Sequence, residues 1–326
     1  KDEALELISQ FLIIFDCHYD HDSKMIGYAD HELENTYVLG GCDKEGNPLF
    51  NDLTKMFLQA TAEEKIIFPK IKCRFSENSP KEYLDMIDKP VIHGTSTILY
   101  HNDDATIPAL IRNGISEEDA KDYIVAGCWG ISTNCSIRKD EGNYVNILKA
   151  FEYEIHNRTD MMQKVGMHFN AIDNAESFDE VYKITCENIN TLFKERNRMT
   201  SKGGQIWEQV DPLPIFSSLF CDCIKNRRDF TNNGAKYNDE CYMCVGFPNV
   251  VDSLLAIKSL CFDKKKYTLK ETLNAVRNNW NGYDEMRLDA IHCPGWGDGS
   301  EESCSLAKKF NADLYNMLSR LTGGYG

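Results

Sequence analysis

Apolar residues recur along the chain at helical spacing in most segments and at strand spacing in a few. Near the start, Leu5, Ile8 and Leu12 share one face of a helix expected over residues 2–22. The same pattern predicts helices over residues 51–60, 81–87, 117–122, 177–199, 213–225, 250–262, 267–280 and 300–321. Their starts are marked by Pro80 as a first-turn proline and by Ser116, Thr268 and Ser300 as caps.

Three other segments have the pattern of strands, namely residues 36–39, 71–75 and 123–127. The last is apolar, ends in Gly127 and leads directly into Cys128. Strands that alternate with helices predict an α/β fold whose strands are buried on both faces. No repeat or linker interrupts the pattern, so we expect a single continuous domain.

Composition narrows the functional classes. The 326 residues carry a formal net charge of -15, which disfavours nucleic acid and anionic membranes as partners. No apolar run reaches the roughly 20 residues that span a bilayer. The first residues have neither a signal-peptide layout nor an initiating Met, so we expect a chain cut from a longer one.

The cysteine content indicates the cellular setting. The 13 cysteines are odd in number and lack the spacing of a disulfide framework. We therefore expect free thiols in a reducing cytoplasm. Exposed thiols oxidise in air, and an anaerobic setting would remove that hazard.

The sharpest local feature is Val125-Ala-Gly-Cys-Trp-Gly130, in which a cysteine follows a strand and is flanked by two glycines. Glycine permits the close approach of a ligand or another backbone. A cysteine at the end of a strand is placed where catalytic residues are often displayed. A buried structural cysteine is the alternative that spacing alone leaves open.

Three blocks of sequence surround this feature. The first is Val38-Leu-Gly-Gly-Cys-Asp-Lys-Glu-Gly. The second spans residues 94–128 and contains His101-Asn-Asp-Asp, Ile107-Pro-Ala-Leu and Ser116-Glu-Glu-Asp-Ala-Lys-Asp-Tyr before Gly127-Cys128. The third comprises Asp211-Pro-Leu-Pro-Ile-Phe-Ser-Ser-Leu, Gly234-Ala-Lys-Tyr-Asn and Asn249-Val-Val-Asp-Ser-Leu.

In order and spacing these blocks resemble glycyl radical enzymes of the pyruvate formate-lyase type, and the glycerol/diol dehydratase and choline lyase branch more than pyruvate formate-lyase itself. The resemblance implies an α/β barrel of ten strands in two antiparallel five-stranded halves, wrapped by helices. Residues 1–326 would form part of that barrel domain. The N-terminal part and the C-terminal glycyl radical domain would lie outside this chain.

The resemblance also implies the chemistry. Cys128 would carry a thiyl radical that takes hydrogen from a small organic substrate, in a lyase or acyltransferase type of reaction that breaks or forms a C–C or C–X bond. The cofactor would be a protein glycyl radical near the end of the longer chain, made by a radical S-adenosylmethionine activating enzyme. A homodimer is expected, and no metal is implied at the site.

The sequence departs from the family pattern at three points. Many dehydratase and lyase members read Gly-Cys-x-Glu, whereas Gly130 stands at the position of the Glu base. Pyruvate formate-lyase has two adjacent cysteines, whereas this chain has Gly127-Cys128. The radical motif Arg-Val-x-Gly-Tyr is absent, and Arg320-Leu-Thr-Gly-Gly-Tyr imitates it with one residue too many. A non-catalytic paralogue or fragment that keeps the barrel is therefore the alternative.

Polar residues of the matched block are candidates for the substrate site. His101, Asn102 and Asp103 would bind substrate or supply the missing acid or base, with Asp104 beside them. Helix capping and loop hydrogen bonds are the structural alternative for Asn and Asp. Trp129 and Gly130 would line the pocket, although ordinary packing is an equal alternative for Trp129. His93 is a further candidate acid or base, or a structural histidine.

Two clusters have the composition of metal sites. Cys221-x-Cys223 and Cys241-x-x-Cys244 could form a four-thiolate zinc or iron–sulfur site, and a zinc-binding module is a further possible function. The alternatives are core thiols, or Cys241 and Cys244 shaping the substrate pocket. Cys17-His18-x-x-His21 could hold a metal, but the acidic residues around it indicate a solvated helix face.

Overall fold

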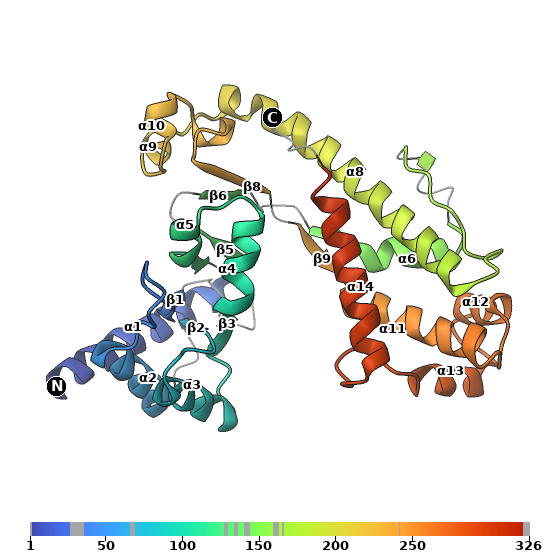
Figure 1. Cartoon of the computed structure of the whole chain (residues 1–326), viewed down its shortest axis with the longest axis horizontal. Helices are drawn as coiled ribbons and strands as arrows, with labels where there is room; N and C mark the ends of the chain where they lie inside the picture. The colour runs from blue at the N-terminus through green and yellow to red at the C-terminus, as the bar shows by residue number, and fades with distance from the viewer. Residues whose placement is uncertain are drawn as a thin grey trace. The chain divides into compact units, whose positions relative to one another are not determined.

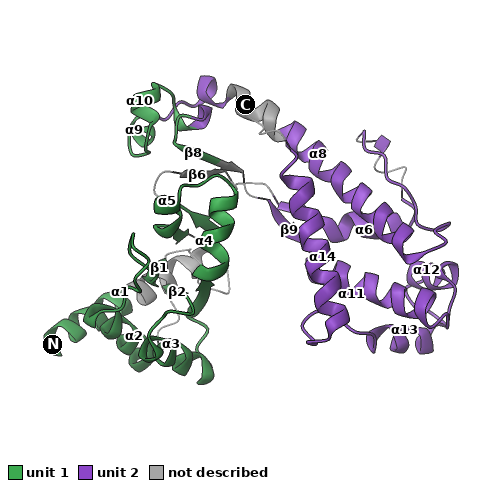
Figure 2. Ribbon diagram, viewed as in Figure 1, with its two compact units in different colours: residues 1–137, 214–230, 234–238 green, residues 138–213, 231–233, 239–326 purple. Residues whose placement is uncertain are grey.

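The computed structural model describes residues 2–26, 36–65, 69–126, 130–133, 136–139, 144–158, 163–164, 166–240 and 242–321, with only the backbone described at 15–26, 126, 136–139, 200–206 and 239–240. The chain divides into two compact units (Figure 2). Unit 1 holds residues 1–137, 214–230 and 234–238, and unit 2 holds residues 138–213, 231–233 and 239–326. Both contain strands and helices, so the α/β class is confirmed, while the single continuous domain stays a prediction.

Unit 1 is built on a parallel sheet whose strands follow the order β1 (Thr36–Gly40), β2 (Lys70–Phe75) and β3 (Ile98–Asn102). The crossover helices are α2 (Asp52–Glu64) and α3 (Lys81–Ile92), and α1 (Asp2–Ile26) packs on α2 (Figure 1). The remaining helices of this unit are α4 (Asp103–Arg112), α5 (Glu117–Lys121), α9 (Pro214–Ser217) and α10 (Cys223–Asn226).

The central strand β2 is buried on both faces, as expected. Ile71 and Cys73 are fully buried in one apolar cluster with Leu58 of α2 and Tyr83 of α3. The alternate residues Lys72 and Arg74 leave the opposite face and are also buried. One face of this sheet is therefore apolar and packed on helices, while the other carries buried cations.

Strand β4 (Ile124–Ala126) forms an antiparallel hairpin with β5 (Gly130–Ser132) and lies beside β1. Val125 is 3% exposed, whereas Ile124 is 41% exposed. The expectation that strands are buried on both faces is wrong for β4 in the described part of the chain. An apolar run does not distinguish a strand with one open face from a fully covered one.

The helix expected over residues 213–225 is not formed. Short helices α9 and α10 are separated by turns, and Asp222 has the left-handed φ of 71°. The aromatic rings of Phe216, Phe220 and Phe230 pack together around this turn, with centroids 5.1–5.9 Å apart. The apolar residues therefore serve a local aromatic cluster and not a helical face.

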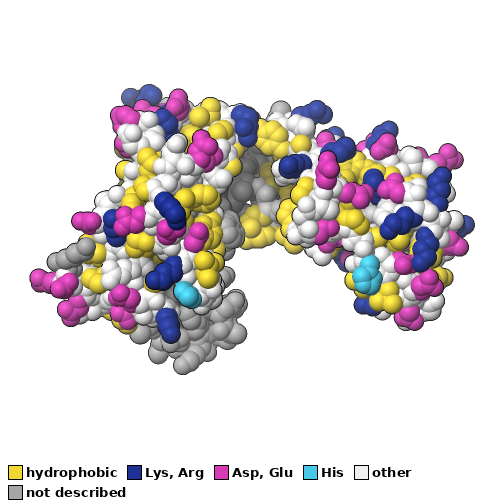
Figure 3. Space-filling model, turned by 60° about the horizontal axis from the view of Figure 1, so that its bottom comes forward, with side chains coloured by type: hydrophobic (Ala, Val, Ile, Leu, Met, Phe, Trp, Pro, Cys, Tyr) yellow, Lys and Arg dark blue, Asp and Glu magenta, His cyan; other side chains and the backbone are white. Residues whose placement is uncertain are grey.

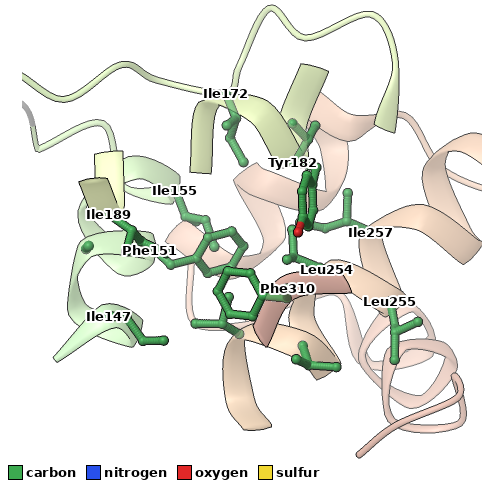
Figure 4. Packing of buried hydrophobic residues seen from close by; sticks show 14 of the residues in the cluster. Ile147, Phe151, Ile155, Ile172, Tyr182, Ile189, Leu254, Leu255, Ile257 and Phe310 are labelled. Atoms are coloured by element: carbon green, nitrogen blue, oxygen red, sulfur yellow. The ribbon is translucent and has the colours of Figure 1, made fainter. Parts of the chain in front are cut away.

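Unit 2 consists mainly of helices that pack around one large apolar cluster. Its helices are α6 (Ile147–Ile155), α8 (Phe178–Val210), α11 (Phe247–Ile257), which continues as the π-helical segment Lys258–Asp263, α12 (Leu269–Arg277), α13 (Asp284–Ile291) and α14 (Glu301–Leu318). Figure 4 shows Phe151 of α6 and Phe310 of α14 together at the centre, and both are fully buried. A parallel pair, β7 (Tyr144–Asn146) and β9 (Met243–Val245), lies at its edge, and β6 (Ser136–Lys139) pairs with β8 (Tyr237–Glu240).

Helix starts follow the expected caps. The Ser116 and Ser300 side chains accept hydrogen bonds from the backbone N–H three residues on, and Thr268 forms a capping box with Glu271. Pro80 is the N-cap residue of α3, one position before the first helical residue at which the sequence predicts it. None of the described helices is long and apolar enough to cross a membrane. On the face seen in Figure 3, the described basic side chains are scattered among acidic ones.

Candidate active site

The β4–β5 hairpin brings the two sides of the cysteine segment together. Ala126 pairs with Gly130 across the antiparallel strands, so the chain reverses direction between these two residues. The three residues that connect them are Gly127, Cys128 and Trp129, which lie outside the described residues. Gly130 is the first residue of β5 and is half-buried. The strand that the sequence predicts before Cys128 is formed at Ile124–Ala126, and its pairing with β5 makes the stem of the cysteine segment a hairpin.

A buried ion pair lies at the base of this hairpin, and we call Arg74, Asp103 and Tyr123 the Arg74 cluster. The Arg74 guanidinium donates to both carboxylate oxygens of Asp103, from Nε at 2.9 Å and from Nη2 at 3.0 Å. The Tyr123 hydroxyl donates to Asp103 Oδ1 at 2.6 Å. The side chains of Arg74 and Asp103 are 6% and 5% exposed. Asp103, predicted as a substrate ligand, thus has its carboxylate engaged within the protein, which fits a positioning role.

His101 lies beside the Arg74 cluster. It is the register partner of Arg74 on β3, so both side chains leave the sheet on the same face, and His101 is 6% exposed. Burial lowers the pKa of His101, as do the nearby cations Lys72 and Arg74, while Asp103 opposes them. The imidazole is therefore neutral at pH 7, a form that can both donate and accept a proton.

The other polar candidates have structural contacts. Asn102 is the N-cap of α4, and its side-chain oxygen accepts from the Asp104 backbone N–H at 2.8 Å. Asp104 Oδ2 accepts from the Glu77 backbone N–H at 2.8 Å. His93 is exposed at the C-terminal end of α3. These contacts correspond to the capping alternative, and substrate binding by Asn102 is untested.

A second polar cluster joins two of the matched blocks. Asp119 of α5 accepts from Lys236 Nζ at 2.6 Å, from the Tyr237 hydroxyl at 2.7 Å and from the Ser116 hydroxyl at 2.7 Å. The Lys236 hydrogen bond, aided by those from Ser116 and Tyr237, holds the pKa of Asp119 at about 2. The carboxylate is therefore charged at every physiological pH. It attaches residues 234–238 to the helix that precedes β4.

Gly40 and Gly41 of the first block are required by close contact. Gly40 has a φ of 75°, and a Cβ at this position would lie 2.3 Å from the Arg74 carbonyl oxygen and 2.4 Å from the Tyr83 hydroxyl. The single proton of that hydroxyl is shared between the Arg74 carbonyl at 3.0 Å and the Leu39 carbonyl at 3.2 Å. The Gly40-Gly41 pair therefore lies where the end of β1 is in close contact with Arg74 near the end of β2.

Gly40→Ala is expected to destabilise the protein by about 3 kcal/mol, because it adds a steric clash with backbone to an unfavourable φ. Gly46→Ala is the matched control, since Gly46 has a φ of 94° but open space around it. The control is expected to cost only about 1 kcal/mol, which is the backbone part alone. Urea-unfolding midpoints measure both, and equal losses would contradict the contact.

The two metal candidates gain no support from geometry. Within the described part of the chain, no three His, Cys, Asp or Glu side chains are grouped as metal ligands. Cys223 is buried and Cys221 exposed, while Cys241 and the side chains of Cys17, His18 and His21 lie outside the described residues. Cys244 is half-buried in unit 2 beside its large apolar cluster.

Comparison with known proteins identifies the family. Residues 1–325 match the family model described as pyruvate formate lyase-like. This chain belongs to that family. It is 30% identical over 252 residues to the (2S)-3-sulfopropanediol dehydratase of Klebsiella oxytoca, an alignment that covers 76% of this chain and 30% of the relative. The trans-4-hydroxy-L-proline dehydratase of Clostridioides difficile is 26% identical over 297 residues, covering 90% and 37% of the two chains.

A solved structure agrees with this assignment. The glycerol-bound form of the B12-independent glycerol dehydratase from Clostridium butyricum superposes with a TM-score of 0.82 at 25% identity, covering 91% of this chain and 38% of that one. The resemblance to glycyl radical enzymes of the dehydratase branch is thereby confirmed. The chain spans well under half the length of each of these three relatives.

Two residues of this pyruvate formate lyase-like chain were missed from the sequence. Arg74 and Tyr123 complete the Arg74 cluster, although neither belongs to an obvious catalytic motif. The signal was present in β2, where Lys70, Lys72 and Arg74 place three cations on the face opposite Ile71, Cys73 and Phe75, and two of the three, Lys72 and Arg74, are buried. Buried cations of this kind call for carboxylate or carbonyl partners.

Proposed function

We propose that this chain is the cysteine-bearing part of a glycyl radical enzyme and that Cys128 is its thiyl carrier. The observation that carries the proposal is the pairing of Ala126 with Gly130, which leaves Cys128 in the short connection of an anchored hairpin. Hydrogen-atom transfer requires the thiol to be held against a substrate C–H bond in a dry cavity. A rigid stem beneath the cysteine meets that requirement.

The proposed role of Cys128 requires the protein radical that the family implies. The glycyl radical, in a residue outside this chain, supplies the unpaired electron. Cys128 would give its thiol hydrogen atom to that residue, take one from a substrate carbon, return it when the product forms, and then recover its own, so that the thiol is restored. Trp129 and Gly130 would border the pocket next to the thiol and exclude water.

We propose cleavage of a carbon–heteroatom bond in a small polar substrate, because the relatives named above are dehydratases. Acyl transfer is less well supported, since this chain has Gly127-Cys128 where pyruvate formate-lyase has two cysteines. Gly130 supplies no carboxylate, so another group must move the proton. We assign that role to His101, whose neutral imidazole is suited to it, with Asn102 capping α4 beside it and Asp103 holding the side chains of Arg74 and Tyr123.

The rest of the assembly is also a proposal. The described strands would contribute to a ten-stranded barrel completed by residues outside this chain. A radical S-adenosylmethionine enzyme would activate the protein in an anaerobic cytoplasm. The active form would be a homodimer, which light scattering can test.

The test of this function is anaerobic activation of the protein that contains this chain. Incubation with a radical S-adenosylmethionine activating enzyme is expected to give a glycyl radical signal by electron paramagnetic resonance. Small diols and hydroxylated amino acids are then supplied, and the loss of substrate is followed. Absence of both the radical and turnover would indicate the non-catalytic paralogue instead.

A further inference from the structure

Arg74 makes more contacts than its ion pair requires. Besides the two bonds to Asp103, Nη1 donates to the Tyr123 carbonyl at 2.9 Å and Nη2 donates to the Lys121 carbonyl at 2.8 Å. The guanidinium carbon also lies 3.8 Å from the centroid of the Tyr123 ring. One buried side chain of β2 thus fixes the backbone that immediately precedes β4.

The Arg74 side chain passes close to Gly41 of the first glycine block. Strand β1 pairs with β2 and also lies beside β4, where the Thr36 hydroxyl contacts the Val125 carbonyl at 3.5 Å. A Cβ on Gly41 would lie 2.8 Å from the guanidinium carbon of Arg74 and 2.9 Å from its Nη1. Only glycine at this position leaves room for Arg74 to reach past β1 to the stem of the hairpin.

Tyr123 is held at both ends. Its carbonyl accepts from Arg74, its hydroxyl donates to Asp103, and its side chain is 1% exposed. It stands directly before β4 and five positions before Cys128 in the sequence. The blocks that contain Gly41, Asp103 and Tyr123 therefore converge on Arg74, which lies outside all of them.

We propose that Arg74 is a positioning residue that sets the placement of the hairpin carrying Cys128. This inference rests on the proposed function of Cys128 as the thiyl carrier. Hydrogen transfer depends steeply on distance, and a misplacement of about 1 Å can cost roughly 100-fold in rate. The Arg74 guanidinium makes four hydrogen bonds that link β2 to the backbone just before β4. A planar group held in this way resists such a shift.

The first variant is Arg74→Lys, which keeps the charge but lacks the planar fork that bonds Asp103 and two carbonyls together. The matched control is Arg277→Lys in unit 2. Arg277 pairs with Asp173 at 2.7 and 2.8 Å and donates from Nε to the Ile155 carbonyl at 2.7 Å, so the control loses the same kinds of bond elsewhere.

The readouts are chosen to separate positioning from simple stability. In the activated full-length protein, Arg74→Lys is expected to lower kcat by about 100-fold with KM and glycyl radical yield nearly unchanged. Amide hydrogen exchange at residues 121–126 and 130–132 is expected to be at least about tenfold faster than in wild type. Arg277→Lys is expected to leave kcat and the exchange of these amides unchanged.

A second variant covers the case in which Arg74→Lys does not fold. Arg74→Met/Asp103→Leu removes both buried charges together, which apolar replacement often tolerates, and still removes the bonds to the two carbonyls. It is expected to show the same loss of kcat and the same faster exchange. Wild-type kcat and exchange in either folded variant would overturn the proposal, as would a kcat loss that only follows the loss of radical or of folded protein.

The proposed function can fail separately. A wild-type protein that forms no radical and turns over no substrate overturns that function and leaves no reaction for Arg74 to serve. In that case the hydrogen-exchange measurement alone tests whether Arg74 anchors the hairpin. Faster exchange in Arg74→Lys supports Arg74 as the anchor of the hairpin, and unchanged exchange overturns it.

Discussion

Replacing Cys128 by serine is expected to abolish turnover while leaving the glycyl radical able to form. An O–H bond is much stronger than an S–H bond, so the radical cannot draw a hydrogen atom from serine and the substrate never meets a thiyl. The loss of kcat should be at least roughly 10⁴-fold, because the variant lacks the hydrogen-transfer route itself. Electron paramagnetic resonance measures the radical, and product formation measures turnover.

The control for this variant is Cys293→Ser. Cys293 is a half-buried thiol of unit 2 whose Sγ donates to the Asp289 carbonyl at 3.3 Å, a bond that a serine hydroxyl can replace. Its substitution is expected to leave turnover unchanged. Turnover of Cys128→Ser at the wild-type rate would remove Cys128 from the mechanism, whereas loss in both variants would point to a general sensitivity to thiol removal.

Glu154→Gln is expected to stabilise the protein at alkaline pH and to have little effect in acid. Glu154 of α6 is fully buried within unit 2. Burial raises the pKa of Glu154 to about 8, although the hydrogen bonds that Thr185 and Asn188 can donate to the ionised form lower it in part. The carboxyl group is therefore largely protonated at neutral pH.

The hydrogen bonds around Glu154 agree with a protonated carboxyl. The Thr185 hydroxyl lies 3.0 Å from the Val181 carbonyl and 2.7 Å from Glu154 Oε1. A hydroxyl has one proton, and a carbonyl can only accept, so donation to Val181 requires the Glu154 carboxyl to donate to Thr185. Asn188 Nδ2 donates to Glu154 Oε2 at 2.7 Å, and its Oδ1 accepts from the Asn170 N–H. Every donor and acceptor is then used once.

The pH dependence follows from the raised pKa. The folded protein holds this proton more tightly than the unfolded chain, whose ordinary value is 4.5. The stability that the carboxyl contributes is therefore complete below about pH 4.5 and is lost as the pH rises to about 8. The full loss is on the order of 5 kcal/mol, since one pKa unit corresponds to about 1.4 kcal/mol.

Glutamine reproduces the protonated form at every pH, because its amide donates to Thr185 and its oxygen accepts from Asn188. Urea-unfolding midpoints of variant and wild type should coincide near pH 4.5, separate as the pH rises to about 8 and keep a constant difference above that pH. Glu152→Gln on the same helix is the control, since Glu152 is half-exposed beside Lys149 and its substitution should leave the pH profile unchanged. Parallel profiles for Glu154→Gln and wild type would show that Glu154 is ionised in the folded state. An infrared carboxyl band lost only in Glu154→Gln would give independent support.

The elements that local chemistry controls were predictable. Caps at Ser116, Thr268 and Ser300 and the strands β1 and β2 agree with the pattern because each depends on neighbours within a few residues. The segment 213–225 was mispredicted because its apolar side chains pack on Phe230, beyond the window in which periodicity is judged. Strand β3 and helix α4 were missed because Asn102 and the acidic residues after it resemble a loop.

The sequence by itself determined the family and the position of the Gly-Cys segment, because both depend on the order and spacing of residues along the chain. It also determined that Gly130 offers no carboxylate. Only the tertiary structure decided what the polar residues of the matched blocks do. Arg74 of β2, Asp103 at the start of α4 and Tyr123 just before β4 meet in one cluster, and Gly41 matters because the Arg74 side chain passes close to it. Such contacts join residues far apart in sequence, so no local pattern contains them.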